Sequence, residues 1–207
     1  MSDWVTARHK VAIAGRVSDA STGKAVSNAL VWIIAMPEAL EQRLTMLSRI
    51  YRNEWSTLQA RLDRTESRED GLFYFLDLPE GSYTIMASIP DSGSRYGTVQ
   101  QPAEVAHDDK GEVKVSFIDL ALQPTCLTGK ITGPNHKTAI VLAEVRVKGS
   151  GERTFSDAQG QYVLRSIEPG RRTIEVSAQG YKPKSEPVTI ASPGTVETVN
   201  MSLARDT

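Results

Sequence analysis

The chain has 207 residues, a net charge of −1 at pH 7 and a single cysteine. This length fits two domains of about 100 residues, each large enough to bury a core without disulfides or structural metals. The balanced charge excludes a global field that would attract nucleic acid or anionic lipid. As the single cysteine, Cys126 cannot form an intramolecular disulfide, and its apolar neighbours predict a buried structural thiol.

The first ten residues lack the apolar run of a signal peptide, and no segment approaches the roughly 20 apolar residues that cross a membrane. We therefore expect a cytoplasmic protein with no membrane span. Other machinery could still incorporate it into an exported or membrane-attached assembly.

Short segments of alternating apolar and polar residues, bounded by Gly, Pro, Asn and Asp, predict β-strands along the first half of the chain. They lie at residues 10–17, 29–34, 72–78, 83–89 and 113–122.

Between the second and third of these strands, the composition changes to Leu, Glu, Gln, Arg and Ala, with no glycine and no further proline from Pro37 to Arg64. This composition predicts a helix, with Glu38 and Glu41 at the positive end of its dipole. Apolar residues at spacings of three and four form one stripe along it: Leu40, Leu44, Leu47, Tyr51, Trp55, Leu58 and Leu62. A single helix of this length would run about 42 Å, against about 20 Å for a strand, so we expect it to overhang the sheet or fold back near Asn53.

The second half of the chain repeats the first without the helix. Its predicted strands lie at residues 127–131, 143–148, 162–167, 172–178, 186–190 and 195–203. The motif Ala14-Gly15-Arg16-Val17 recurs as Thr128-Gly129-Lys130-Ile131, and residues 70–85 recur as 159–174. We therefore predict an all-β chain of two tandem antiparallel sandwiches, residues 1–123 and 124–207, with a helical insertion at 37–65 in the first.

These motifs resemble the carboxypeptidase regulatory-like family, a transthyretin-like (prealbumin-type) seven-stranded sandwich. The resemblance rests on an opening Gly-x-Val, an Ala-x-Val strand, an Asp-x-x-Gly-x-Tyr turn and a Leu-Pro-x-Gly-x-Tyr-x-Ile turn. The first copy carries them at Gly15–Val17, Ala29–Val31, Gly71–Phe73 and Leu78–Ile85, and the second at 129–131, 143–145, 157–162 and 167–174. Everything except residues 37–69 is covered. The resemblance implies the fold and a module that is non-catalytic in most settings.

The two copies differ on the outward side of two strands. The second copy alternates charge outward at residues 143–148, whereas the first has Leu30, Trp32 and Ile34 at the matching positions. Likewise, Leu72, Tyr74 and Leu76 stand where the second copy has Gln161, Val163 and Arg165. Six outward apolar residues would form a large patch, so we expect the inserted helix to lie across it, with Trp32 facing Trp55. The helix then either completes a third layer of its own domain or offers part of its stripe to a partner.

The sequence shows no set of residues for catalysis, metal binding or a cofactor. His9, His107 and His136 are isolated and lack metal-ligand spacing, and no glycine-rich phosphate loop opens a helix. Lys130 and Asn200, on the first and last strands of the second copy, invite comparison with the Lys–Asn isopeptide bonds of pilin-type sandwiches. Alternation places both side chains outside the core, which argues against that bond.

We therefore predict a non-catalytic structural or adaptor protein, whose partners are protein subunits of a larger assembly or further copies of itself. By analogy of fold, that assembly could be a phage-like tail or contractile injection apparatus. The alternative is a carbohydrate- or peptide-binding module. Its site would lie in the end loops at 91–96 and 149–151, with Trp4 or Tyr96 as the aromatic contact.

Overall fold

The structure is a computed structural model that describes residues 9–58, 61–90, 94–109 and 111–206. Its contacts divide the chain into two compact units. The first unit comprises the described parts of 1–90 and 98–122, and the second comprises those of 91–97 and 123–207.

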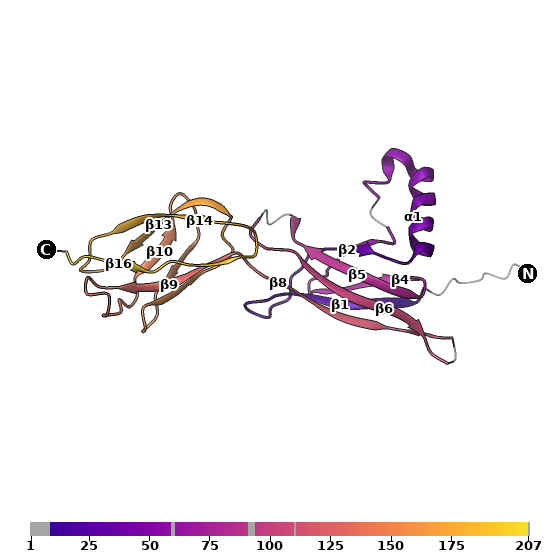
Figure 1. Ribbon diagram of the computed structural model, residues 1–207, viewed down its shortest axis with the longest axis horizontal. Helices are drawn as coiled ribbons and strands as arrows, with labels where there is room; N and C mark the ends of the chain where they lie inside the picture. The colour runs from indigo at the N-terminus through magenta and orange to yellow at the C-terminus, as the bar shows by residue number, and fades with distance from the viewer. Residues whose placement is uncertain (1–8, 59–60, 91–93, 110, 207) are drawn as a thin grey trace, which may run out of the picture. The chain divides into compact units, whose positions relative to one another are not determined.

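The first unit is a sandwich of two sheets, one ordered β3-β2-β5-β6-β7 and the other β4-β1-β8 (Figure 1). The strands are β1 (Val11–Asp19), β2 (Leu30–Ala35), β3 (Arg64–Glu66), β4 (Leu72–Leu76), β5 (Gly81–Ser88), β6 (Val99–His107), β7 (Val113–Lys114) and β8 (Ser116–Leu122).

The second unit has the same order without a counterpart of β7: β11-β10-β13-β14 in one sheet, and β12-β9-β15 in the other, where β16 also pairs with β9. The strands are β9 (Cys126–Thr132), β10 (Glu144–Val147), β11 (Arg153–Phe155), β12 (Gln161–Leu164), β13 (Gly170–Ser177), β14 (Lys184–Ile190), β15 (Val196–Thr198) and β16 (Met201–Ser202). The predicted pair of duplicated sandwiches is confirmed.

The core of each unit is formed by the inward residues of these alternating strands. Phe73, Ile85 and Leu120 are among the buried residues of the first unit, and Leu127 and Ile174 are among those of the second. Burying such side chains provides the main driving force for folding. Cys126 is buried at the start of β9, as predicted.

The prediction of purely antiparallel sheets is wrong for one pairing in each unit. The last strand runs parallel to the first, with β8 beside β1 and with β15 and β16 beside β9. Glycine permits a close approach here, because a Cβ atom on Gly15 would lie 2.3 Å from the Ile118 carbonyl oxygen. On Gly129 it would lie 1.8 Å from the Val199 oxygen.

Strand β6 was not predicted, because Gln100, Gln101 and Pro102 interrupt its apolar pattern. Pro102 pairs opposite Thr84 of β5, and β7 bonds to β6 only near His107. At Pro102, the side of β6 that faces away from β5 is therefore an open edge. Because no neighbouring strand among the described residues bonds there, the absence of a backbone N–H on Pro102 costs little stability.

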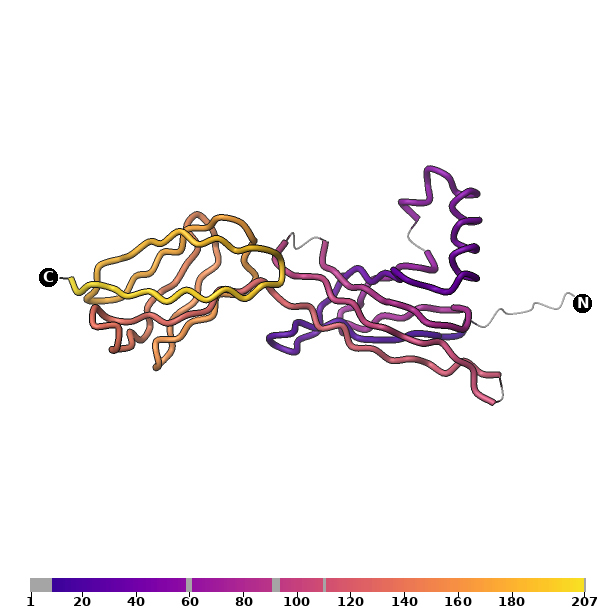
Figure 2. Tube along the Cα trace, viewed as in Figure 1, coloured from indigo at the N-terminus to yellow at the C-terminus, as the bar shows by residue number. Residues whose placement is uncertain are grey.

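The helical insertion leaves the first sandwich after β2. Helix α1 (Glu38–Tyr51) ends where Arg52 adopts a left-handed φ of 47°, and a 3₁₀ turn, η1 (Arg52–Glu54), follows. The α-helix therefore covers only Glu38–Tyr51 of the predicted helical insertion, and the chain turns back close to Asn53, which is one of the two arrangements expected (Figure 2). No glycine or proline marks this end in the sequence.

Candidate functional site

The insertion is anchored at its base. Leu40 is the buried residue of α1. Pro37, just before the helix, packs against Gly81, where a Cβ atom would lie 2.5 Å from the proline ring. Gly81 has a φ of 140°, so glycine is required there for both space and conformation. The start of α1 is therefore tightly held by the end of the five-stranded sheet.

Beyond this base, the apolar stripe packs largely within the insertion itself. The Trp55 ring stacks on Tyr51 at a centroid distance of 6.5 Å, and the Arg61 guanidinium lies 4.2 Å above Trp55. Arg61 is oriented by Asp63, whose Oδ1 accepts its Nε–H at 2.8 Å. Trp55 thus meets Tyr51 and Arg61 instead of Trp32. The other stripe residues are half-buried: Leu44, Leu47, Leu58 and Leu62.

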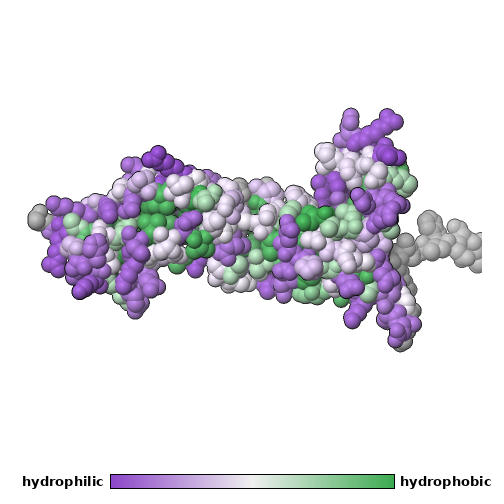
Figure 3. All heavy atoms as spheres, viewed as in Figure 1, coloured by the Kyte–Doolittle hydropathy of each residue, from purple (hydrophilic) through white to green (hydrophobic). Residues whose placement is uncertain are grey.

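The insertion does not lie across the outward apolar residues of the strands. Helix α1 contacts η1 more than any strand, and it rises away from the sheets (Figure 1). Ile34, Leu72 and Tyr74 remain 43%, 40% and 37% exposed. The space-filling view shows apolar surface on the first unit below the insertion, while the outer end of the insertion is hydrophilic (Figure 3).

The six outward apolar residues also do not form one patch, because their strands belong to opposite sheets. Leu30, Trp32 and Ile34 lie on β2, and Trp32 pairs opposite Met86 of β5. Leu72, Tyr74 and Leu76 lie on β4 in the three-stranded sheet. Alternation identifies the buried side of a strand, but it does not say to which sheet the strand belongs.

The two sets meet at one edge of the sandwich, where β3 of one sheet lies beside β4 of the other. A hollow of about 680 Å³ opens there, and Leu30, Leu62, Tyr74 and Leu76 line it. Four of the residues expected at an interface therefore converge. Three of the charged groups around the hollow, His9, Asp77 and Arg61, form ion pairs. His9 bonds to Asp77, and Arg61 bonds to Asp63.

Polar contacts near the hollow affect Asp77 and Tyr74. The hydrogen bond from His9, together with the Lys10 backbone N–H, holds the pKa of Asp77 below its usual value. Arg68 bonds to the Tyr74 hydroxyl and places its guanidinium 4.8 Å from the ring centre. Tyr74 is thereby held in place as part of the outer surface.

The outward face of the three-stranded sheet carries an apolar row that crosses all three strands. Ala14 of β1 lies between Tyr74 of β4 and Phe117 of β8. Phe117 is 61% exposed, and Leu72 flanks the row from the next outward position on β4. The small Ala14 side chain leaves a shallow apolar surface between two aromatic rings.

The second unit carries polar residues on the corresponding face. Thr128 replaces Ala14 in the matching position and lies between Val163 and Thr198, while Gln161 lies opposite Lys130. The same sandwich therefore folds with a more polar outer face, on which Val163 is 38% exposed. Folding alone does not require the exposed Tyr74, Leu72 and Phe117 of the first unit.

The loops proposed for the alternative binding site are engaged within the second unit. Arg95 forms ion pairs with Glu152 at 2.9 Å and with Glu168 at 3.7 Å. The half-buried Tyr96 accepts a hydrogen bond from the Ser166 hydroxyl at 3.5 Å. Trp4, the other candidate, lies outside the described residues.

The described residues show no group of three or more His, Cys, Asp or Glu side chains that could hold a metal ion. His9 bonds to Asp77, His107 lies 3.6 Å from Glu80, and His136 sits in a turn. In the described part of the chain, no helix is long and apolar enough to cross a membrane. Lys130 and Asn200 both point outward, as alternation predicted, and the Lys130 backbone N–H donates to Asn200 Oδ1 at 2.8 Å.

Residues 126–204 match the model of the carboxypeptidase regulatory-like domain family. The match extends from β9 to just beyond β16 and therefore covers the second unit. It confirms the resemblance inferred from the motifs of this copy. No curated protein is similar enough in sequence to be matched.

Solved structures of pilins are among those that match the chain, at low sequence identity. The shaft pilin SpaA from Lactobacillus rhamnosus GG is 11% identical with a TM-score of 0.44, and the alignment covers 97% of this chain and 98% of the pilin. A streptococcal ancillary pilin is 12% identical with a TM-score of 0.38 over 97% of this chain. The chain spans 63% of that pilin and 34% of the Bacillus anthracis TIE protein, another similar structure.

Proposed function

Residues 126–204 form a carboxypeptidase regulatory-like domain. From this premise, we propose that the chain is a non-catalytic structural protein. We propose further that it binds another protein subunit through its first unit. The binding surface is the outward face of β4-β1-β8, continued at its edge by the hollow beside β3. The second unit serves as a spacer or a further attachment domain.

One observation carries this proposal: the two copies of one fold differ in the polarity of the same face. Tyr74, Ala14 and Phe117 form the row in the first unit, where the second has Val163, Thr128 and Thr198. Exposed aromatic and aliphatic side chains gathered on a sheet face are typical of protein-binding surfaces. Arg16 and Asp119, which lie opposite each other beside the row, supply a polar rim.

The second copy also supplies the substitutions that test the proposal. Leu72→Gln and Phe117→Thr place on the first unit the residues that the second unit carries at the matching positions. Because a sandwich of the same topology tolerates those residues, we expect the double variant to keep its fold and its melting temperature. Met46→Gln and Ile50→Gln, on the exposed side of α1, form the control, because they also replace two exposed apolar side chains.

The experiment is sedimentation velocity of the purified chain across dilution, followed by quantitative capture of binding proteins from cells that make it. We expect self-association, or retention of one defined subunit in stoichiometric amounts, for the wild type and the α1 control. The double variant should lose it. A wild type that stays monomeric and retains nothing that the double variant loses would contradict the proposal.

We propose more specifically that the chain and its partner subunit belong to a phage-like tail or contractile injection apparatus. This proposal rests on analogy of fold alone. Co-sedimentation of the chain with particles of that size from producing cells, abolished by Leu72→Gln/Phe117→Thr, is the result that would support it.

A further inference from the structure

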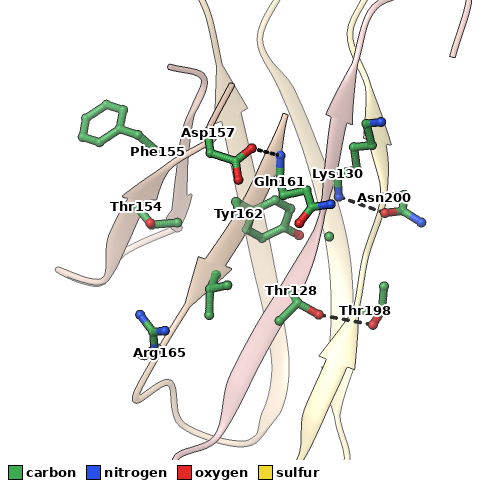
Figure 4. Close-up of a pocket in the computed structure, with 12 residues that line it drawn as sticks. Thr128, Lys130, Thr154, Phe155, Asp157, Gln161, Tyr162, Arg165, Thr198 and Asn200 are labelled. Carbon is green, nitrogen blue, oxygen red and sulfur yellow. Dashed lines mark hydrogen bonds between the residues drawn. The ribbon is translucent and has the colours of Figure 1, made fainter. Parts of the chain in front are cut away.

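The second unit carries a hollow at the same edge as the first, but with different chemistry. It has a volume of about 560 Å³ and lies over β12, β9 and β15, with β11 at its side. Its floor is the outward face of the sheet. Gln161, Lys130 and Asn200 lie side by side across that face (Figure 4).

The side chains of this hollow offer hydrogen-bond donors that the protein does not use. Among the described residues, the Lys130 ammonium, the Arg165 guanidinium and the Gln161 amide have no hydrogen bond or ion pair, and the Asn200 amide uses only its oxygen. Elsewhere on this unit, Arg95, Arg146, Lys148, Arg153, Arg172 and Lys184 all form ion pairs. Lys137, Arg171, Lys182 and Arg205 also form no ion pair with any described residue, so what distinguishes the hollow is that two unpaired cations and two amides line one surface.

The one carboxylate that lines the hollow, Asp157, offsets one of its two cations but is itself engaged in hydrogen bonds. Asp157 Oδ1 already accepts the backbone N–H groups of Gln159 and Gln161, at 2.9 and 2.8 Å. The hydroxyls of Thr128 and Thr198 lie 3.2 Å apart and bond to each other. The hollow therefore presents a donor-rich surface with two cations and one carboxylate to a ligand.

An apolar side chain borders this polar floor. Phe155 of β11 is 54% exposed, and its ring projects away from the strands (Figure 4). At the opposite end of the hollow from Lys130 lies Arg165 (Figure 4). A ligand that spans the hollow would meet a cation at each end and an aromatic ring at one side.

We propose that this hollow, defined by Lys130, Phe155, Gln161, Arg165 and Asn200, binds an acidic oligosaccharide. The carboxylates of uronic acid residues would pair with Lys130 and Arg165, and ring and hydroxyl oxygens would accept from Gln161 and Asn200. The apolar face of one sugar ring would lie against Phe155. This site differs from the end loops around Tyr96, and it stands independently of the protein-binding face on the first unit.

A ligand that lies on the floor of the hollow contacts side chains, because strand β9 is paired on both sides, with β12 and with β15. Recognition therefore falls to side-chain amides and cations, which suit the many oxygen acceptors of a charged sugar. Among the described strands, the outer edge of β12 is unpaired, so an extended acidic peptide is the competing ligand that the test has to separate from a sugar.

The test uses the full chain and three acidic probes, namely tetra- to hexasaccharides of polygalacturonate, alginate and hyaluronan. The comparison ligand is the methyl-esterified galacturonate oligomer, which is neutral. We expect saturable changes in the side-chain amide NMR signals of Gln161 and Asn200 with at least one acidic probe. The methyl ester should bind about tenfold more weakly, because it cannot pair with the cations.

Three variants separate this site from non-specific attraction. Lys130→Ala/Arg165→Ala should weaken binding about tenfold or more, and Phe155→Ala about fivefold. Lys137→Ala/Arg171→Ala removes the same charge from exposed positions outside the hollow and should leave affinity within about twofold. Each altered side chain is exposed, so circular dichroism should show an unchanged fold.

Absence of binding for all three acidic probes up to about 10 mM would overturn the proposal. Equal losses in the hollow and control variants would also overturn it, since they would indicate a diffuse charge effect. So would poly-glutamate binding with the same signals and affinity, because the site would then recognise acidic peptides.

Discussion

Ser67 and Ser156 make the same two hydrogen bonds in the two units. The Ser67 hydroxyl accepts the Ala29 N–H at 2.9 Å and donates to the Val26 carbonyl at 2.7 Å. The Ser156 hydroxyl does the same with Ala143 and Ile140, at 2.9 and 2.7 Å. Both side chains are almost fully buried. Each serine ties the short strand β3 or β11 to the segment before the next strand of its sheet.

Replacing either serine by alanine should destabilise its unit by about 1–3 kcal/mol, because a buried N–H and a buried carbonyl lose their partner. Trp32 and Trp55 belong to the first unit, and the second unit has no tryptophan, so tryptophan fluorescence in urea reports on Ser67→Ala. Circular dichroism reports on Ser156→Ala. The exposed Ser177→Ala is the control. A shift no larger than that of the control would show that water replaces the serine hydroxyl.

Gly129→Ala should destabilise the second unit by about 1–3 kcal/mol or more, because the added Cβ would lie 1.8 Å from the Val199 oxygen and would force β9 away from the last strand. Gly151→Ala is the matched control, since no atom lies within 4 Å of a Cβ at that position. Thermal unfolding followed by calorimetry should resolve the difference. Equal melting temperatures for the two variants would contradict the close strand approach.

Leu40→Ala should cost about 2–5 kcal/mol, because Leu40 is the buried residue of α1 and its loss leaves a cavity at the base of the insertion. Met46→Ala, on the exposed side of the same helix, should change stability by less than about 0.5 kcal/mol. Urea unfolding monitored by tryptophan fluorescence measures both. If the two variants were equally stable, the insertion would not be anchored through Leu40.

Burial raises the pKa of Tyr83 to about 12, because the phenolate is disfavoured inside the first sandwich. A raised pKa stabilises the folded state fully below the unfolded value near 10, and this contribution is lost as pH rises through about 12. Ultraviolet titration of the phenolate should show a late step that Tyr83→Phe removes. Tyr162 is raised in the same direction by burial and provides an independent late step. Full ionisation of both near pH 10 in the folded protein would contradict their burial.

Alternation along the strands was enough to predict both sandwiches and the buried side of most strands. Val199, Met201 and Leu203, for example, face the core and leave Asn200 outside, as expected. Strand β6 was not predicted because it contains Pro102, and proline is unusual in strands. The open edge of the sheet at this position is what allows proline here. The parallel pairing of first and last strands also escaped, because alternation carries no information about strand direction.

The candidate binding face could be predicted only in part. The outward positions of Leu72 and Tyr74 follow from the pattern of β4, and the inward Leu120 and Leu122 would have placed Phe117 outward by the same argument. What the sequence lacked was the sheet order, which separates these residues from Trp32 and Ile34. The length of the insertion predicted a turn back near Asn53 as one possibility. The exact end of α1 at Tyr51, however, depends on the conformation of Arg52, which is not a residue type that favours a positive φ.

The parallel pairing of first and last strands determines how each unit would respond to pulling. In a parallel pair, the start of the first strand and the end of the last lie at opposite ends of the ladder, so tension shears its hydrogen bonds together and does not peel them apart one by one. In the first unit, this ladder joins Ile13–Asp19 to Ser116–Leu122 without a break. In the second, it is split between β15 and β16. If the two ends of the chain are pulled apart, we therefore expect the second unit to extend before the first.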